Sequence, residues 1–177
     1  MPSGERLILE LDPAGGAALR VEWDVDALRD REATSHEAGT GDVTPAWRVE
    51  PEPDWERSSA LRLISATFDD GALLAVAALR PRGAAGHDAD AVGAILVSPE
   101  GEVTRPREAL LSTEYGPDGM ARRLGLELYE DSAAPPVRVV ADRVAGASEG
   151  EGGGRTALAL RMEGTPGAGL YEQINAR

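Results

Sequence analysis

Polar and apolar side chains alternate along most of this 177-residue chain, and this period of two restricts its fold more than any other feature. The clearest examples are residues 19–26 (LRVEWDVD) and 122–129 (RRLGLELY). Successive side chains of a β-strand point to opposite faces of a sheet, so alternation marks strands with one buried face and one exposed face. The pattern therefore predicts antiparallel sheet.

Turn residues separate the alternating segments at intervals of about one strand length. Pro13–Gly16 follows a first strand at residues 6–12, and Asp69-Asp70-Gly71 joins residues 61–68 to residues 72–80 in a second hairpin. Further strands are predicted at residues 91–98, 121–130, 137–145, 156–163 and 168–175. Many short strands must protect their edges, so we predict a mainly β fold: an antiparallel, lipocalin-like barrel of about ten strands, with a β-sandwich as the alternative.

Four segments depart from the strand pattern. Residues 26–38 are compatible with a short helix capped by Asp26, and residues 107–115 contain enough helix formers for a turn or two of helix. Residues 40–57 are expected to form a long loop, and residues 149–154 (EGEGGG) a flexible acidic loop. Strands continue on both sides of each loop, so we interpret residues 1–177 as one β-barrel domain.

The absence of two residue types excludes several reaction classes. Without Cys there is no thiolate nucleophile, thiolate metal site or disulfide. All 18 basic residues are Arg, so there is no Schiff-base lysine and no P-loop lysine. Exclusive use of Arg, with abundant Ala, Gly, Pro, Asp and Glu, is typical of a GC-rich bacterial genome.

The charge and hydropathy of the chain exclude two kinds of partner. A net charge of −13 would repel both nucleic-acid phosphates and anionic bilayers, so neither nucleic acid nor membrane is expected as a partner. The longest apolar run, Ala72–Leu79, is too short to span a bilayer, and the N-terminal residues lack the pattern of a signal peptide. We therefore expect an acidic, cytoplasmic protein.

Three short segments carry a resemblance to a known family. They are RLISATFDDGALLAVAALRP at residues 62–81, GAGLYEQ at residues 167–173, and Arg29-Asp30-Arg31-Glu32. Together they resemble the second barrel of the lipocalin-like proteins of the AttH and carotenoid-hydratase (hydroxyneurosporene synthase) type, and the order of the elements along the chain matches as well. The resemblance implies a cup-shaped β fold with an apolar interior, the kind of concavity that holds lipids, terpenoids or polyketides. Family members usually carry two such barrels, whereas this chain has the length of one.

Two clusters of polar residues contain potential metal ligands. His87-Asp88-Ala89-Asp90 contains three potential ligands, but it lies in a Gly-rich segment and is better interpreted as a solvated turn. Asp24, Asp26 and Asp30 lack the Gly and Glu spacing of a calcium loop and are interpreted as a polar strand face. No metal and no cofactor are expected.

The candidate ligand-binding residues are the aromatic side chains and one acidic residue of the last strand. Trp47 and Trp55 lie in the polar segment at residues 40–57, where they are candidates for a lid, and Tyr171 and Glu172 are candidates for orienting a polar end of the ligand. The alternative role for each aromatic residue is core filling, and for Glu172 a solvated or Arg-paired position. The full set of ligand-binding candidates is Trp23, Trp47, Trp55, Phe68, Tyr129, Tyr171 and Glu172.

Three functions are compatible with this sequence. The first is the binding of an apolar small molecule (a lipid, terpenoid or polyketide) in the barrel cavity. The second is an isomerase, cyclase or hydratase acting on such a molecule, with Glu172 as general acid and Asp30 as its neighbour, because a carboxylate enclosed by apolar side chains can retain a proton. The third is a structural partner without a ligand, which forms a homodimer or pairs with another barrel through an apolar outer face.

Overall fold

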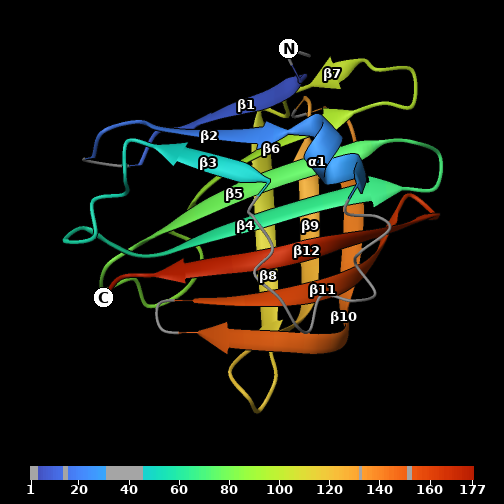
Figure 1. Ribbon diagram of the computed structural model, residues 1–177. Coiled ribbons are helices and arrows are strands. Elements are labelled where there is room, and N and C mark those ends of the chain that lie inside the picture. Colours follow the sequence, from blue (N-terminus) through green and yellow to red (C-terminus); the bar gives the residue numbers. More distant parts are fainter. Residues whose placement is uncertain (1–3, 14–15, 31–45, 132, 151–152) are drawn as a thin grey trace.

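The computed structural model describes residues 4–13, 16–30, 46–131, 133–150 and 153–177 (Figure 1). These residues contain twelve strands and one short helix, α1 (Val25–Asp30), which follows the second strand. The strands are β1 (Arg6–Leu11), β2 (Leu19–Asp24), β3 (Trp47–Glu50), β4 (Ser58–Phe68), β5 (Leu73–Pro81), β6 (Ala91–Val97), β7 (Val103–Thr104), β8 (Glu108–Tyr115), β9 (Ala121–Tyr129), β10 (Val137–Gly150), β11 (Gly153–Met162) and β12 (Thr165–Asn175).

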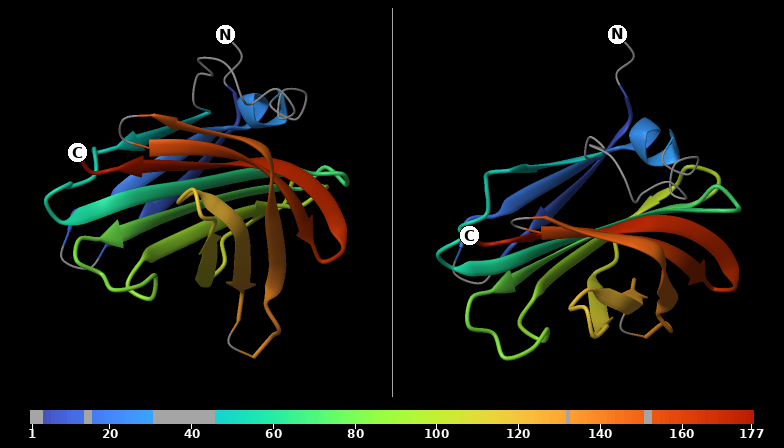
Figure 2. Two further views of the ribbon diagram at one scale, coloured as in Figure 1. Left: turned by 90° about the horizontal axis from the view of Figure 1, so that it is seen from below. Right: turned by 60° about the horizontal axis from the view of Figure 1, so that its bottom comes forward.

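Nine of these strands form one antiparallel sheet in the order β7-β6-β5-β4-β12-β11-β10-β9-β8. The sheet curls, so that β8, β9 and β10 cross over β4, β5 and β6 (Figure 2). Residues of β6 and β8 come into contact, although the two strands are not hydrogen-bonded neighbours. The fold is therefore a half-barrel with an opening between β6 and β8, and the predicted mainly β, antiparallel, lipocalin-like architecture is confirmed.

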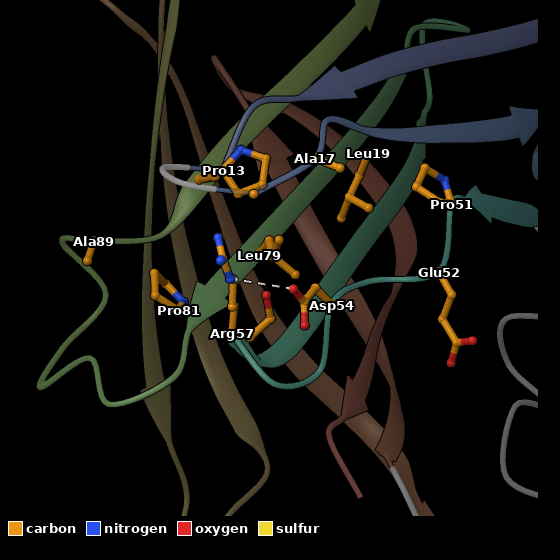
Figure 3. Close-up of a pocket in the computed structure, with 13 residues that line it drawn as sticks. Pro13, Ala17, Leu19, Pro51, Glu52, Asp54, Arg57, Leu79, Pro81 and Ala89 are labelled. Carbon is orange, nitrogen blue, oxygen red and sulfur yellow. Dashed lines mark ion pairs between the residues drawn. The ribbon is translucent and has the colours of Figure 1, made fainter.

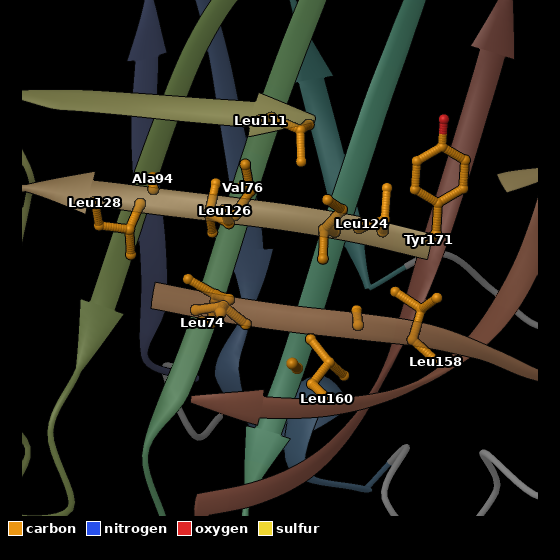
Figure 4. Packing of buried hydrophobic residues seen from close by; sticks show 14 of the residues in the cluster. Leu74, Val76, Ala94, Leu111, Leu124, Leu126, Leu128, Leu158, Leu160 and Tyr171 are labelled. Carbon is orange, nitrogen blue, oxygen red and sulfur yellow. The ribbon is translucent and has the colours of Figure 1, made fainter. Parts of the chain in front are cut away.

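The concave side of the curled sheet has its own hydrophobic core. Apolar side chains of β4 and β5 meet those of β9, β10 and β11 where the two parts of the sheet cross (Figure 4). Removing this apolar surface from water stabilises the fold by about 25 cal/mol for each Å² that is buried. Buried members of this concave core include Ile64, Leu74, Val76, Leu124, Leu126, Leu128, Leu158, Leu160 and Tyr171.

A separate three-stranded sheet, in the order β1-β2-β3, covers the other face of β4, β5 and β6. Its apolar side chains form a second core with Leu61, Leu63 and Leu73. Gly93 in β6 permits the close approach, because a Cβ atom at this position would lie only 3.0 Å from Cδ1 of Leu9. β4 and β5 are thus buried on both faces, which explains why residues 72–79 are apolar without alternation.

Helical turns are predicted at residues 107–115, but Glu108–Tyr115 forms strand β8, so this prediction is wrong. Ala109 and Leu111 are buried on the concave side, and every residue from Glu108 to Tyr115 is paired with β9. Hydrogen bonding and burial in the sheet outweigh the weak helix propensities of Glu, Ala and Leu.

The structure describes only part of each of the other three segments that depart from the strand pattern. The helix predicted at residues 26–38 is seen as α1 up to Asp30, and its N-terminal cap is Asp24 rather than Asp26, because Ala27 N donates to Asp24 Oδ1 at 2.9 Å. The segment at residues 40–57 includes β3, which pairs with β2. In residues 149–154, β10 continues to Gly150 and β11 begins at Gly153. Residues 31–38, 40–45 and 151–152 lie outside the described residues.

Candidate functional site

A buried arginine is the most unusual feature of the concave side. In β4 the side chains of Leu61 and Leu63 face the three-stranded sheet, whereas Arg62 and Ile64 face the concave core. Only 2% of Arg62 is exposed. A charged side chain is costly to bury unless it is paired and hydrogen-bonded, so its partners define the site.

The guanidinium of Arg62 has two partners from opposite sides of the half-barrel opening. Its Nη2 lies 2.5 Å from Oδ2 of Asp90, whose side chain is completely buried, and its Nη1 donates to Oγ1 of Thr113 at 2.6 Å. Asp90 directly precedes β6, and Thr113 belongs to β8. These contacts join the two edges that backbone hydrogen bonds leave open.

Three aromatic rings extend this polar group. His87 Nδ1 lies 3.2 Å from Asp90 Oδ2, and His87 Nε2 lies 3.5 Å from the hydroxyl of Tyr115. Tyr171 lies in the same part of the concave side and donates to Oε1 of Gln173 at 2.7 Å. We refer to Arg62, His87, Asp90, Thr113, Tyr115 and Tyr171 as the Arg62 cluster.

The burial of Tyr171, Arg62 and Asp90 determines the electrostatics of the cluster. Burial raises the pKa of the Tyr171 phenol well above its usual range, and the neighbouring Tyr115 raises it further, whereas the positive charge of Arg62 opposes the increase. Tyr171 therefore stays a neutral hydrogen-bonding group. The guanidinium of Arg62 and the carboxylate of Asp90 neutralise each other, so the pair presents dipoles rather than a net charge.

A cavity of about 430 Å³ lies beside the cluster. Its walls include apolar side chains of the concave core from β8, β9 and β10, together with Val92 of β6. They also include the ion pair of Glu127 and Arg138, and the cavity reaches His87 and Asp90. This volume is within the range of roughly 300 to 1,000 Å³ that is usual for small-molecule sites. Apolar walls with a few convergent polar groups are the usual construction of such a site.

Three buried polar atoms on the concave side lack a hydrogen-bond partner within the part of the chain that the structure describes. They are Nε of Arg62, Oδ1 of Asp90 and Oγ1 of Thr156. Thr156 in β11 pairs with Tyr171 in β12, so the two side chains share a face. Buried polar atoms are normally hydrogen-bonded, so these three atoms represent unused hydrogen-bonding capacity on the concave side, where Asp90 also lines the cavity.

Only two of the residues predicted to bind a ligand face the concave side, namely Phe68 and Tyr171. Trp23 is fully buried in the second core, and Trp47 and Trp55 pack against the same core, so none of the three tryptophans lines the 430 Å³ cavity. Tyr129 follows the buried Leu128 in β9, so its side chain points to the opposite face of the sheet. Its hydroxyl donates a hydrogen bond to Glu127, and this bond, more than burial, raises the pKa of Tyr129.

Glu172 shares a face with Ile174, as the period of two predicts, but this is the face toward the three-stranded sheet. Its carboxylate accepts hydrogen bonds from Nε of Arg155 at 3.0 Å and from the indole of Trp47. Adjacent strand residues point to opposite faces, so Tyr171 and Glu172 cannot orient the same end of one ligand. Asp30, its predicted catalytic neighbour, is exposed at the end of α1.

A second, smaller cavity lies between the two sheets, near the ends of β2, β4 and β5 (Figure 3). Its volume is about 110 Å³, and Leu19, Leu79 and Pro81 form part of its wall, near the ion pair between Arg57 and Asp54. This volume is well below the roughly 300 Å³ at which small-molecule sites begin. The concave cavity is therefore the better candidate.

The cluster residues Arg62, His87, Asp90, Thr113 and Tyr115 were not predicted as site residues. One signal was available, because Arg62 is the only charged residue among the otherwise apolar or hydroxyl-bearing residues 61–68. A lone arginine in a strand buried on both faces requires a buried acceptor. The acceptor, Asp90, was instead interpreted as part of a solvated turn, which is wrong for its side chain.

Two features are absent from the residues that the structure describes. These residues contain no helix long and apolar enough to cross a membrane. They also contain no group of three or more His, Asp or Glu side chains placed to hold a metal ion. The predicted cytoplasmic location and the predicted homodimer stay predictions.

Comparisons with known proteins give a fold likeness only. No protein-family model matches the chain, and no curated protein matches its sequence. Among solved structures, the chain is similar to kievitone hydratase from Nectria haematococca, with a TM-score of 0.51 and 11% sequence identity. The likeness covers 75% of this chain and 46% of the hydratase chain, so the matched part spans less than half the length of that protein.

This likeness supports the sequence resemblance in its coarser form. The chain shares a barrel fold with a hydratase, as the resemblance implied. The carotenoid-hydratase type is not supported, because the similar structure is a hydratase of another kind.

Proposed function

We propose that this protein binds a small, mainly apolar molecule in the concave cavity of the half-barrel. The observation that carries this proposal is the 430 Å³ cavity, whose largely apolar wall reaches His87 and Asp90 of the Arg62 cluster. A lipid, terpenoid or polyketide of moderate size would bury its hydrocarbon part against β8, β9 and β10. The fold likeness to a hydratase is compatible with a barrel that encloses a ligand.

The polar end of the ligand is a carbonyl or hydroxyl group rather than a carboxylate. Arg62 is already neutralised by Asp90, so the cluster offers no uncompensated positive charge to an anion. The net charge of −13 further disfavours anionic ligands. A neutral oxygen can exchange hydrogen bonds with His87 and Tyr115 at a much lower desolvation cost.

Two adjacent residues of β6 provide a matched test. Val92 lines the concave cavity, whereas its neighbour Ala91 points to the opposite face and lines the small cavity between the sheets. The neutral fluorescent probe N-phenyl-1-naphthylamine is titrated into the wild type, Val92→Phe and Ala91→Phe. We expect saturable fluorescence enhancement with the wild type, an affinity at least about tenfold lower with Val92→Phe, and a change within about twofold with Ala91→Phe.

Thermal unfolding of each variant shows whether an altered affinity reflects an altered fold. A second filling variant, Ala109→Leu, narrows the same cavity from β8 and should weaken binding in the same direction. The proposal is wrong if the wild type does not bind the probe. It is also wrong if Ala91→Phe weakens binding and Val92→Phe does not, since the ligand would then lie between the two sheets.

A further inference from the structure

His87 has the surroundings of a general base. Its Nδ1 lies 3.2 Å from Oδ2 of Asp90, and its Nε2 is directed toward the hydroxyl of Tyr115 at 3.5 Å. The side chain is 22% exposed and forms part of the cavity wall. An imidazole held on one side by a carboxylate, with its other nitrogen beside a hydroxyl group at the wall of a cavity, can transfer protons to and from a bound molecule.

The ion pair between Arg62 and Asp90 determines which imidazole nitrogen of His87 carries the proton. The same oxygen of Asp90 contacts Arg62 and His87, and the carboxylate has no exposed surface. Paired with a guanidinium, Asp90 is a hydrogen-bond acceptor only, so Nδ1 of neutral His87 must donate to it. The lone pair is then on Nε2, the nitrogen nearest Tyr115. Arg62 and Asp90 act as positioning residues in this arrangement, because they reach the ligand through His87.

We propose that His87 catalyses proton transfer at the carbon next to the carbonyl group of the bound ligand. Nε2 removes the proton from that carbon, and the C–H electron pair forms a carbon–carbon double bond. The carbonyl π electrons move to the oxygen, which accepts a hydrogen bond from the Tyr115 hydroxyl. The imidazolium, stabilised by the carboxylate of Asp90, then returns a proton to carbon. The cycle balances without an added co-reactant, and it amounts to enolisation or isomerisation of an apolar ketone.

This inference rests on the proposed binding function and names its substrate class. The cavity supplies the apolar enclosure, and the cluster supplies a base, a hydroxyl donor and an anchoring ion pair within one connected group. The elements involved are far apart in sequence, since His87 and Asp90 precede β6 while Tyr115 ends β8. Closure of the half-barrel at this opening therefore assembles the catalytic group.

The test uses 1-tetralone, an apolar bicyclic ketone, in deuterated buffer. Proton NMR follows the loss of the signal from the carbon next to the carbonyl, and displacement of N-phenyl-1-naphthylamine measures the binding of 1-tetralone. We expect the wild type to accelerate exchange and His87→Gln to lose about 100-fold or more of that acceleration while still binding the ketone. Tyr115→Phe should retain binding and lose part of the acceleration.

The outcomes separate this inference from the proposed function. If 1-tetralone binds the wild type, and binding is weakened by Val92→Phe, but exchange is not accelerated, the catalytic inference is overturned and the binding function stands. Acceleration that persists in a folded His87→Gln variant also overturns it. If 1-tetralone and the naphthylamine probe both fail to bind, the proposed function fails and the inference fails with it. Thermal melts establish that His87→Gln and Tyr115→Phe are folded, which their partly exposed positions favour.

Discussion

The buried pair of Arg62 and Asp90 makes a quantitative prediction. The two side chains are 2% and 0% exposed, and the shortest nitrogen–oxygen distance between them is 2.5 Å. Arg62→Met removes the guanidinium and leaves a buried carboxylate, and Asp90→Asn leaves a buried guanidinium. Removing one member of such a pair typically lowers the free energy of unfolding by about 3–5 kcal/mol, because the remaining charge is uncompensated.

The double variant shows whether the two charges are coupled. Arg62→Met with Asp90→Asn removes both charges from an otherwise apolar core, so its loss of unfolding free energy should be smaller than the sum of the two single losses. Each single variant should melt about 6–20 °C lower, at roughly 2–4 °C per kcal/mol for a chain of this size. The three tryptophans pack in or against the second core, so their fluorescence in urea reports unfolding without touching the site.

Single-variant losses below about 1 kcal/mol, the value of a solvent-exposed salt bridge, would contradict a fully buried ion pair. Purely additive losses in the double variant would contradict it as well. Either result would mean that water reaches the pair and that Asp90 does not hold His87 in a fixed orientation.

Two more predictions concern the last strand. The pKa of Tyr171 is raised in the folded state, so the native protein retains the phenol proton above a pH of about 10, where the unfolded chain loses it. The stability that Tyr171 contributes below that pH is therefore lost as the pH rises. The free energy of unfolding, measured in urea at increasing pH, should therefore fall less steeply for Tyr171→Phe than for the wild type. The chain has no lysine that would titrate in the same pH range. Parallel pH dependences of the two proteins would contradict the burial of the Tyr171 phenol. Glu172→Gln should lower the free energy of unfolding by about 1–3 kcal/mol through its bonds to Arg155 and Trp47. It should leave probe affinity and ketone exchange unchanged, and a loss of exchange would return Glu172 to the catalytic role suggested by the sequence.

Most of the strands were predictable because alternation and turn residues are local signals. Residues 6–12 and 121–130 alternate in the sequence and form β1 and β9 within a residue of the predicted ends. β8 was missed because its Glu, Ala and Leu residues are also good helix formers, and only pairing with β9 decides the conformation. β3 was missed because a four-residue strand inside a Pro-rich and acidic segment carries too few alternating positions.

The candidate site was much less predictable, for a physical reason. Alternation correctly placed Glu172 with Ile174 and opposite Tyr171, but it does not specify which face of β12 the three-stranded sheet covers. Arg62 and Asp90 are 28 positions apart in the chain, and their contact depends on the curl of the whole sheet. His87 and Tyr115 are also 28 positions apart, on the two sides of the opening. Such long-range contacts leave no periodic signal in a single sequence.

We place the ligand on the concave side of the half-barrel rather than in the space between its two sheets. A crystal structure of the protein with bound 1-tetralone tests this most directly. We predict electron density for the ketone between β6 and β8–β10, with its oxygen within hydrogen-bond distance of Tyr115 and its ring against Val92. Density beside Leu19 and Leu79 between the sheets, with the concave cavity filled by its own side chains, would contradict the account.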